Sequence, residues 1–245
     1  KIQMRYAQNL TELREYSEEH SKMKNMLSMV DPNIKEIDLL NTIDTASLGK
    51  IQFKDQVYDM VNNRVVNHNP EFYSIKSIER DFMKKEDIPK KSFDFIDNIL
   101  NSNFDPDPKI SKQKSEYFLQ LIGYAMFGIN SERRFIFGLG PSATGKGVLS
   151  ELVLSTFGSY VITTDPSIYI RSEYNNSSGP KPEIRRLHAA RICWSQEINM
   201  TKTVDGTKIK SLVSGGDKMS CRTLHKEEVE IRINSLRLGK INSLR

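Results

Sequence analysis

The sequence predicts an α/β protein in which a mainly helical region precedes a core of parallel strands flanked by helices. A short apolar run at 135–140 enters a glycine-rich turn, and a helix-like segment closed by Gly158 follows it. A second β-prone apolar run at 190–198 ends in an acidic residue. This order of strand, loop, helix and strand is typical of an α/β core. We expect the helical region to span residues 1–130 and the core to span residues 131–245.

The first 66 residues predict a helix and then a small β element. Apolar residues recur at mostly helical spacing over 4–30, and Asp31 followed by Pro32 supplies a stop. Residues 50–66 contain two short β-prone runs divided by a polar turn. A small hairpin or meander is expected there.

Two further helices are predicted before the core. The first helix has five apolar residues near one face: Phe93, Phe95, Ile96, Ile99 and Leu100. The prolines at 106 and 108 end this helix. The second spans 111–127, with Ser111 as its N-cap and Gly128 as its stop. Its apolar residues fall at i, i+3, i+4, i+7 and i+8: Phe118, Leu121, Ile122, Ala125 and Met126.

The second apolar run is preceded by a predicted loop and followed by a predicted short helix and then strands. The polar segment 171–182 reads as an exposed loop between two halves of one domain. Residues 205–216 predict a helix that ends at two glycines. The remaining residues alternate like paired strands, with a charged turn at 225–228.

The composition is that of an ordinary globular protein, with 38% hydrophobic and 27% charged residues in a chain of 245. It contains neither an apolar run of about 18 residues nor a signal-peptide pattern, so we expect an intracellular protein that is neither secreted nor membrane-bound. Cys193 and Cys221 have no zinc-site spacing and are expected to be reduced, buried thiols. Because the chain begins at Lys1 and stops at Arg245 after a β-rich stretch, we expect a fragment of a longer protein.

The positive charge is concentrated near the end of the chain. Residues 201–245 hold ten Lys and Arg against five Asp and Glu, whereas residues 1–200 hold 26 of each sign. The net charge of +5 therefore comes from the last fifth of the sequence. Such an excess suits a surface that faces a polyanion, although an excess of this kind, taken alone, is more often a solvated charged face.

The turn after the first apolar run has the spacing of a phosphate-binding loop. It fits G-x-x-x-x-G-K and departs only at Gly147, where Ser or Thr is usual. In such loops the backbone N–H groups surround the phosphates, and the lysine, here Lys146, neutralises their charge. The predicted phosphate-contacting residues are Gly140, Pro141, Ser142, Ala143, Thr144, Gly145, Lys146, Gly147 and Val148. The alternative is a glycine-rich turn that binds nothing.

The hydroxyl missing at Gly147 normally holds Mg²⁺. We expect the metal to have one protein ligand fewer, replaced by water or by the hydroxyl of Thr144 or Ser142. A nucleotide hydrolase also needs an acid at the end of a neighbouring strand to hold Mg²⁺ and orient the attacking water. Glu197 is the candidate for both tasks, and its alternative interpretation is a solvated glutamate at a strand end.

The chain resembles the helicase portion of poxvirus-type and phage- or plasmid-type primase-helicases, which are superfamily 3 helicases of the AAA+ class. The resemblance rests on FDFIDNIL, on YFLQLIGYAMFGINSERRFIFGLGPSATGKG and, in the family's order, on RICWSQEI, KIKSLVSGGDKMSCR and LGKINSL. The first 45 residues match only loosely. The resemblance implies an AAA+ P-loop ATPase core, with ATP as substrate and Mg²⁺ as cofactor.

The resemblance also implies roles for single residues. Glu197 corresponds to the Walker B acid, and Asn242 to the residue that senses the γ-phosphate. His225 and Lys226 lie at the turn of a β-hairpin that would contact DNA in the channel of a hexameric ring. A segment between the ATP site and this hairpin corresponds to Lys210, Leu212, Gly216, Asp217 and Arg222. In the family, the arginine that such rings insert into a neighbouring site follows the sensor strand, so the resemblance implies a position beyond Asn242. Arg222 and Arg237 are not strong substitutes for it.

The leading hypothesis from the sequence is an ATP-dependent DNA helicase module of a viral or mobile-element replication protein. Its expected partners are single-stranded or forked DNA, further copies of itself in a ring and a primase domain on the same chain. Its expected location is the host cytoplasm or a viral replication site. The alternatives are a catalytically weakened P-loop protein that binds ATP and DNA, and a small-molecule P-loop kinase.

Overall fold

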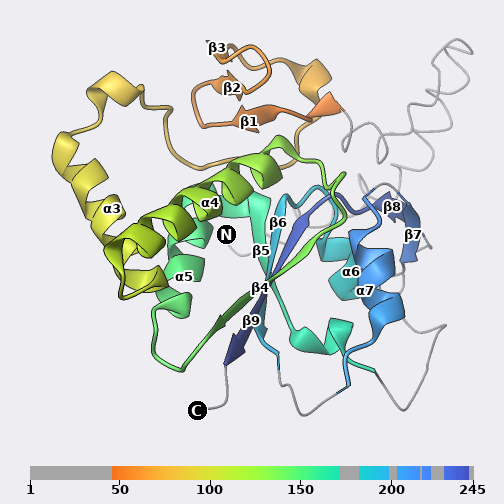
Figure 1. Ribbon diagram of the computed structural model, residues 1–245. Coiled ribbons are helices and arrows are strands. Elements are labelled where there is room, and N and C mark those ends of the chain that lie inside the picture. Colours follow the sequence, from red (N-terminus) through yellow and green to blue (C-terminus); the bar gives the residue numbers. More distant parts are fainter. Residues whose placement is uncertain (1–45, 172–181, 199–202, 216, 222–228, 243–245) are drawn as a thin grey trace, which may run out of the picture. The chain divides into compact units, whose positions relative to one another are not determined.

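The computed structural model describes residues 46–171, 182–198, 203–215, 217–221 and 229–242 (Figure 1). The chain divides into two compact units, Lys1–Asp38 and Leu39–Arg245, and every described residue belongs to the second. The helix predicted over 4–30 lies outside the described residues. The division at residue 130 stays a prediction.

The described part of the chain contains a four-stranded parallel sheet in the order β4-β9-β6-β5. Its strands are β4 (Phe135–Gly140), β5 (Val161–Thr164), β6 (Ile192–Glu197) and β9 (Leu236–Asn242). Figure 1 shows α4 (Pro108–Phe127) and α5 (Lys146–Phe157) on one side of this sheet, with α6 (Pro182–Arg186) and α7 (Gly206–Val213) on the other. The predicted α/β fold class is confirmed.

The alternation of side chains along the two central strands divides the core into two clusters. Trp194 of β6 and Leu238 of β9 pack with residues of α4 and α5. Cys193, one residue before Trp194, and Ile241, three residues after Leu238, pack in the second cluster with residues of α7. Both faces of the two central strands are therefore buried, as is typical of parallel sheets. Cys193 and Cys221 are buried free thiols, as predicted.

The helices before the core match the predicted pattern, except at one start. Helix α4 begins after Asp107, whose carboxylate accepts hydrogen bonds from the amides of Lys109 and Ile110. The predicted N-cap at Ser111 was wrong, because Pro108 is well suited to the first position of a helix and extends α4 by a turn. Gly128 ends α4 in the left-handed conformation at φ 93°, as predicted.

Helix α3 (Lys90–Phe104) ends before Asp105 and lies along α4. Its predicted apolar face is only partly covered. Leu100 is buried and Ile96 packs against the first cluster, whereas Phe93 and Phe95 are exposed.

An antiparallel meander precedes these helices at the position that the sequence predicts. Its strands are β1 (Lys50–Gln52), β2 (Val57–Asp59) and β3 (Arg64–Val66). The amide of Gln52 donates to the hydroxyl of Tyr160 over 2.9 Å, and Ile51 packs into the first cluster. The meander therefore shares a core with the parallel sheet.

A second antiparallel pair joins β7 (Lys218–Cys221) to β8 (Val229–Arg232), which agrees with the predicted paired strands. The remaining described helical elements are short 3₁₀ turns: η1 (Pro70–Phe72), η2 (Lys85–Asp87), η3 (Gly158–Tyr160) and η4 (Pro166–Tyr169). Among the described residues, no helix is both long and apolar enough to cross a membrane.

Arg191 connects the meander, α4 and the sheet from the start of β6. Its buried guanidinium donates to the carbonyls of Ser47 (2.7 Å), Lys50 (2.6 Å) and Met126, and lies 4.6 Å from the centre of the Tyr160 ring. Burial lowers the pKa of Arg191 from its ordinary value, and the nearby Tyr160 opposes this shift. A buried charge is tolerated here because the carbonyl oxygens and the ring replace its lost hydration.

Replacing Arg191 with Met should lower the free energy of unfolding by about 3 kcal/mol, because three carbonyls lose their charged donor. Urea unfolding would measure the loss. Arg186→Met is the matched control, since Arg186 is exposed, and it should change stability by no more than about 0.5 kcal/mol. Equal losses in the two variants would contradict a clamping role for Arg191.

Candidate functional site

The predicted phosphate-binding loop connects β4 to α5 and has the backbone that this connection requires. Strand β4 ends at Gly140 and helix α5 begins at Lys146. Ala143 and Gly145 both have positive φ angles, of 61° and 80°. These left-handed residues turn the chain sharply, so that the free N–H groups at the first turn of α5 face the space beside the loop. The local geometry suits an anion.

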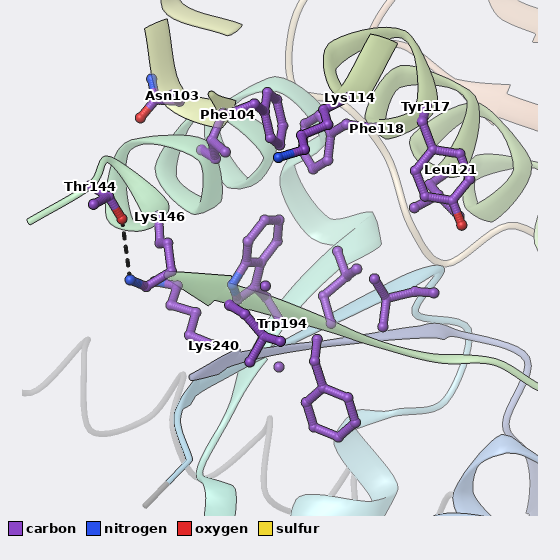
Figure 2. A pocket seen from close by; sticks show the side chains of 17 residues that line it. Asn103, Phe104, Lys114, Tyr117, Phe118, Leu121, Thr144, Lys146, Trp194 and Lys240 are labelled. Atoms are coloured by element: carbon purple, nitrogen blue, oxygen red, sulfur yellow. Dashed lines mark hydrogen bonds between the residues drawn. The ribbon is translucent and has the colours of Figure 1, made fainter. Parts of the chain in front are cut away.

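Lys146 folds back over this loop. Its ammonium donates to the carbonyls of Gly140 (2.8 Å) and Pro141 (2.6 Å), and lies 3.3 Å from the Thr144 hydroxyl. The dashed line in Figure 2 marks the contact with Thr144. The Thr144 hydroxyl in turn donates to the carbonyl of Pro141 over 2.9 Å. The lysine is therefore held next to the loop by the loop's own oxygens.

A cavity of about 170 Å³ brings the loop together with the acid at the end of β6. We call it the loop cavity, and its lining residues are Ser142, Ala143, Thr144, Gly145, Lys146, Gly147, Glu197 and Lys240. The proximity of Glu197 to the loop, which the sequence predicts, is thus present in the structure. Gly140 and Pro141 contribute carbonyls to Lys146 instead, and Val148 is half exposed on α5.

A β-bulge brings Glu197 into this cavity. Along β6, Ser195 pairs with Gly239 of β9, but Glu197 rather than Gln196 pairs with Lys240. The extra residue shifts the alternation by one, because bulges re-aim the side chains that follow them. Without it, Glu197 would share a face with Cys193 and Ser195.

Lys240 is a member of the loop cavity that the sequence analysis missed. Its ammonium lies 5.9 Å from the centre of the Trp194 ring. Burial lowers the pKa of Lys240; the carboxylate of Glu151 raises it, and the charge of Lys146 lowers it further. The available signal was a lysine between Leu238 and Ile241, two apolar residues of a central strand.

A larger, mainly apolar cavity of about 360 Å³ adjoins the loop cavity, and Thr144, Lys146 and Lys240 line both. Figure 2 shows this second cavity, with the Trp194 ring between the aromatic residues of the helices and Lys240. Trp194 is 7% exposed, and its ring lies 6.4 Å from that of Phe118 on α4.

The two glycines beside Lys146 differ in their surroundings. A Cβ atom at Gly145 would lie 1.3 Å from Oδ1 of Asn103, at the end of α3. A Cβ atom at Gly147 would meet nothing within 4 Å. Any side chain at Gly145 would therefore be strained by the positive φ and would have to displace Asn103, whereas the absence of a side chain at Gly147 reflects no steric demand.

The loop cavity has donors that suit Mg²⁺ together with a polyphosphate. Among the described residues, no three His, Cys, Asp or Glu side chains form a cluster that could hold a metal by themselves. Glu197 supplies one carboxylate, and Ser142 and Thr144 supply hydroxyls beside it. Mg²⁺ commonly binds one or two carboxylates and completes its shell with phosphate oxygens and water, so these residues fit the ion only when a phosphate ligand is present.

The remaining predicted site residues are only partly described. Asn242 ends β9 and pairs with Gly140, next to the loop, but its side chain lies outside the described residues. His225, Lys226 and Arg222 also lie outside them, between β7 and β8. Arg237 is fully buried within β9, which agrees with the expectation that it is no substitute for an arginine inserted into a neighbouring site.

Two viral proteins are similar to the chain in sequence. A protein of Sputnik virophage named "Putative helicase V13" is 24% identical over 225 residues, which make up 90% of this chain and 28% of that protein. A protein of Acanthamoeba polyphaga mimivirus named "Putative helicase L207/L206" is 31% identical over 123 residues, 49% of this chain and 13% of that protein. The chain thus spans less than a third of either relative. No protein-family model matches it.

Solved structures of the NrS-1 C terminal region are also similar. One apo structure covers 85% of this chain and 58% of its own, with 16% identity and a TM-score of 0.42. An A form apo structure covers 61% of this chain and 33% of its own, with 21% identity and a TM-score of 0.40. These scores are too low to add to the fold seen directly in the chain.

Gly145→Ala should lower the free energy of unfolding by about 2 kcal/mol, because the new methyl group meets Asn103 and the positive φ is strained. Gly147→Ala should be neutral or stabilising by about 0.5 kcal/mol, since it removes a glycine from the first turn of a helix. Urea unfolding of the two variants tests the difference. A loss at Gly147 as large as that at Gly145 would contradict it.

Proposed function

We propose that the chain is the ATP-hydrolysing part of a DNA helicase that serves replication of a virus or mobile element. The observation that carries the proposal is the loop cavity, where the phosphate-binding loop, Lys146 and Glu197 face one another. The sequence similarity to two viral proteins with helicase names supports the choice of a helicase among P-loop proteins. The AAA+ class and superfamily 3 membership belong to the same proposal.

The binding step follows from the chemistry of the loop. The N–H groups of the loop and of the first turn of α5 bind phosphate oxygens, and Lys146 exchanges its carbonyl acceptors for the β- and γ-phosphates. When bound, Mg²⁺ would withdraw charge from the phosphate oxygens, with Glu197 and the cavity hydroxyls as its protein-side ligands.

In the hydrolysis step, Glu197 orients a water molecule toward the γ-phosphorus. The water's oxygen forms a new bond to phosphorus as the bond to the β,γ-bridging oxygen breaks, which yields ADP and inorganic phosphate. Lys146 stabilises the charge that develops on the phosphate oxygens. Asn242, at the end of β9 beside Gly140, would contact the γ-phosphate and report its loss to the rest of the core.

The chain would move on DNA as a hexameric ring, with His225 and Lys226 at the tip of a hairpin that contacts the strand in the central channel. Both groups contact phosphates by charge or as donors and need not read bases. A primase domain on the same longer protein and an intracellular site of action complete the proposal.

One alternative function has a specific observation behind it. Gly147 provides no hydroxyl for Mg²⁺, and Glu197 is the sole carboxylate lining the loop cavity as the structure describes it. A P-loop protein that binds ATP and DNA but hydrolyses slowly would show the same features. No described residue favours a small-molecule kinase in particular.

Removing either charged group of the loop cavity should separate these functions. In the full-length protein, Lys146→Ala should abolish ATP hydrolysis by weakening nucleotide binding. Glu197→Gln should keep nucleotide bound and lower turnover by about a hundredfold or more, because water is no longer activated. Phosphate release with and without single-stranded DNA is the measurement. The control is Lys84→Gln, because Lys84 is exposed and lines neither cavity.

The outcomes of this experiment distinguish a helicase, a small-molecule kinase and a weakened ATP-binding protein. Hydrolysis that DNA stimulates and that Lys146→Ala abolishes is the expected result for a helicase. Hydrolysis indifferent to DNA, together with phosphorylation of a small molecule, would identify a kinase. Nucleotide binding without hydrolysis in the wild type would identify the weakened site.

Lys226→Ala should weaken single-stranded DNA binding and reduce by about one the slope of log affinity against log salt, because one phosphate contact is lost. ATP hydrolysis in the absence of DNA should stay at the wild-type rate. Fluorescence anisotropy over a salt series measures the slope, with Lys84→Ala as the control. An unchanged slope would remove Lys226 from the DNA interface.

A further inference from the structure

We propose that Lys240 is a second phosphate-binding residue, whose ammonium contacts the terminal phosphate of a nucleoside triphosphate held by the loop around Lys146. The inference rests on the proposed function only in taking a nucleoside triphosphate as the ligand. It does not require that the protein hydrolyse the nucleotide or bind DNA.

The sheet places Lys240 beside the loop. Lys240 pairs with Gly138 of β4 on one side and with Glu197 of β6 on the other. Because side chains alternate along β9, Lys240 shares a face with Leu238, which packs in the cluster that contains residues of α5. Its side chain therefore lies on the side of the sheet where α5 begins, and it lines the loop cavity together with Lys146.

The ammonium groups of Lys146 and Lys240 face one cavity and repel each other, since the charge of Lys146 lowers the pKa of Lys240. The carboxylate of Glu151 on α5 attracts the Lys240 ammonium and raises its pKa. Lys146 has acceptors within the loop, whereas the Lys240 side chain is only partly buried, so water can hydrate its ammonium. A ligand with several negative charges would relieve the repulsion between the two ammonium groups.

The position within the cavity indicates which phosphate Lys240 would contact. The loop amides and Lys146 surround the site of the β-phosphate in any loop of this kind. Lys240 lies next to Glu197, the residue proposed to orient the attacking water. The terminal phosphate is the one that must lie between the loop and that water.

A structural role for Lys240 is the competing explanation. Its methylene stem could cover Trp194 while its ammonium reaches water, as lysines commonly do. That role requires the stem and not the charge. Met keeps an unbranched stem of similar length without the charge, and Arg keeps the charge.

The test measures the binding of a non-hydrolysable ATP analogue (AMP-PNP) and of ADP to the full-length protein, by titration calorimetry with Mg²⁺ and with EDTA. Lys240→Met should weaken AMP-PNP binding about tenfold and ADP binding less than about twofold, because only the triphosphate reaches Lys240. Lys240→Arg should restore AMP-PNP binding to within about threefold of the wild type. Lys84→Met is the control and should change neither affinity.

Withdrawal of Mg²⁺ should widen the difference between wild type and Lys240→Met, since the lysine then carries more of the charge compensation. A merely structural role would lower the unfolding temperature of Lys240→Met without nucleotide and leave the ratio of AMP-PNP to ADP affinity unchanged. That result, or equal losses for both nucleotides, would overturn the proposal. If Lys240→Met unfolds, the same ratio measured in Lys240→Gln decides.

The proposal for Lys240 and the proposed helicase function can fail independently of each other. A wild-type protein that binds AMP-PNP but does not hydrolyse ATP would refute the helicase proposal and still allow Lys240 to be judged by the affinity ratio. A wild-type protein that binds neither nucleotide would overturn both.

Discussion

The buried guanidinium of Arg191 is the interaction on which the arrangement of the described unit depends. It receives no counter-charge from a carboxylate in the described bonds; backbone carbonyls before β1, in β1 and at the end of α4 hold it instead. The backbone of the same residue accepts from Leu236 and donates to Tyr160, which ties β9 and the start of β5 to the same point. One residue thus sets where the meander and α4 lie against the sheet, and through α4 it fixes one wall of the large cavity.

Opposite Arg191, at the carboxyl ends of the strands, the same sheet assembles the candidate site. Strand β4 leads into the loop, β6 brings Glu197 and β9 brings Lys240, so three neighbouring strands each contribute one element. Ligands of open parallel sheets are expected at this edge. The bulge at Gln196 is a small departure from regularity with a large effect, because it decides to which face Glu197 belongs.

The sequence was sufficient to predict the local features of this protein. It was insufficient for features that depend on the register between distant strands. The spacing of the loop, the ends of α4 and α5 at Gly128 and Gly158, and the meander are read from neighbouring residues, and the structure agrees with them. The N-cap of α4 was wrongly placed at Ser111, because Pro108 was taken only as the end of the preceding helix and proline also favours the first turn of a helix.

Lys240 and the bulge were missed for a different reason. The register between β6 and β9 joins segments about 40 residues apart, and no local pattern encodes it. The exposed Phe93 and Phe95 show the same limit, because periodicity identifies an apolar face but not whether anything covers it. The candidate site is therefore predictable in its loop and its acid, and not in its second lysine.

The resting contacts of Lys146 give the loop a property of its own. Since the ammonium already donates to two loop carbonyls, an incoming anion competes with the protein for the same donor. Binding is then an exchange of partners in which the number of hydrogen bonds to Lys146 changes little. The side chain of Lys146 is thus ordered without a ligand. A ligand must bind the ammonium more strongly than the neutral carbonyls do, so the loop should select strongly charged anions over weakly charged ones.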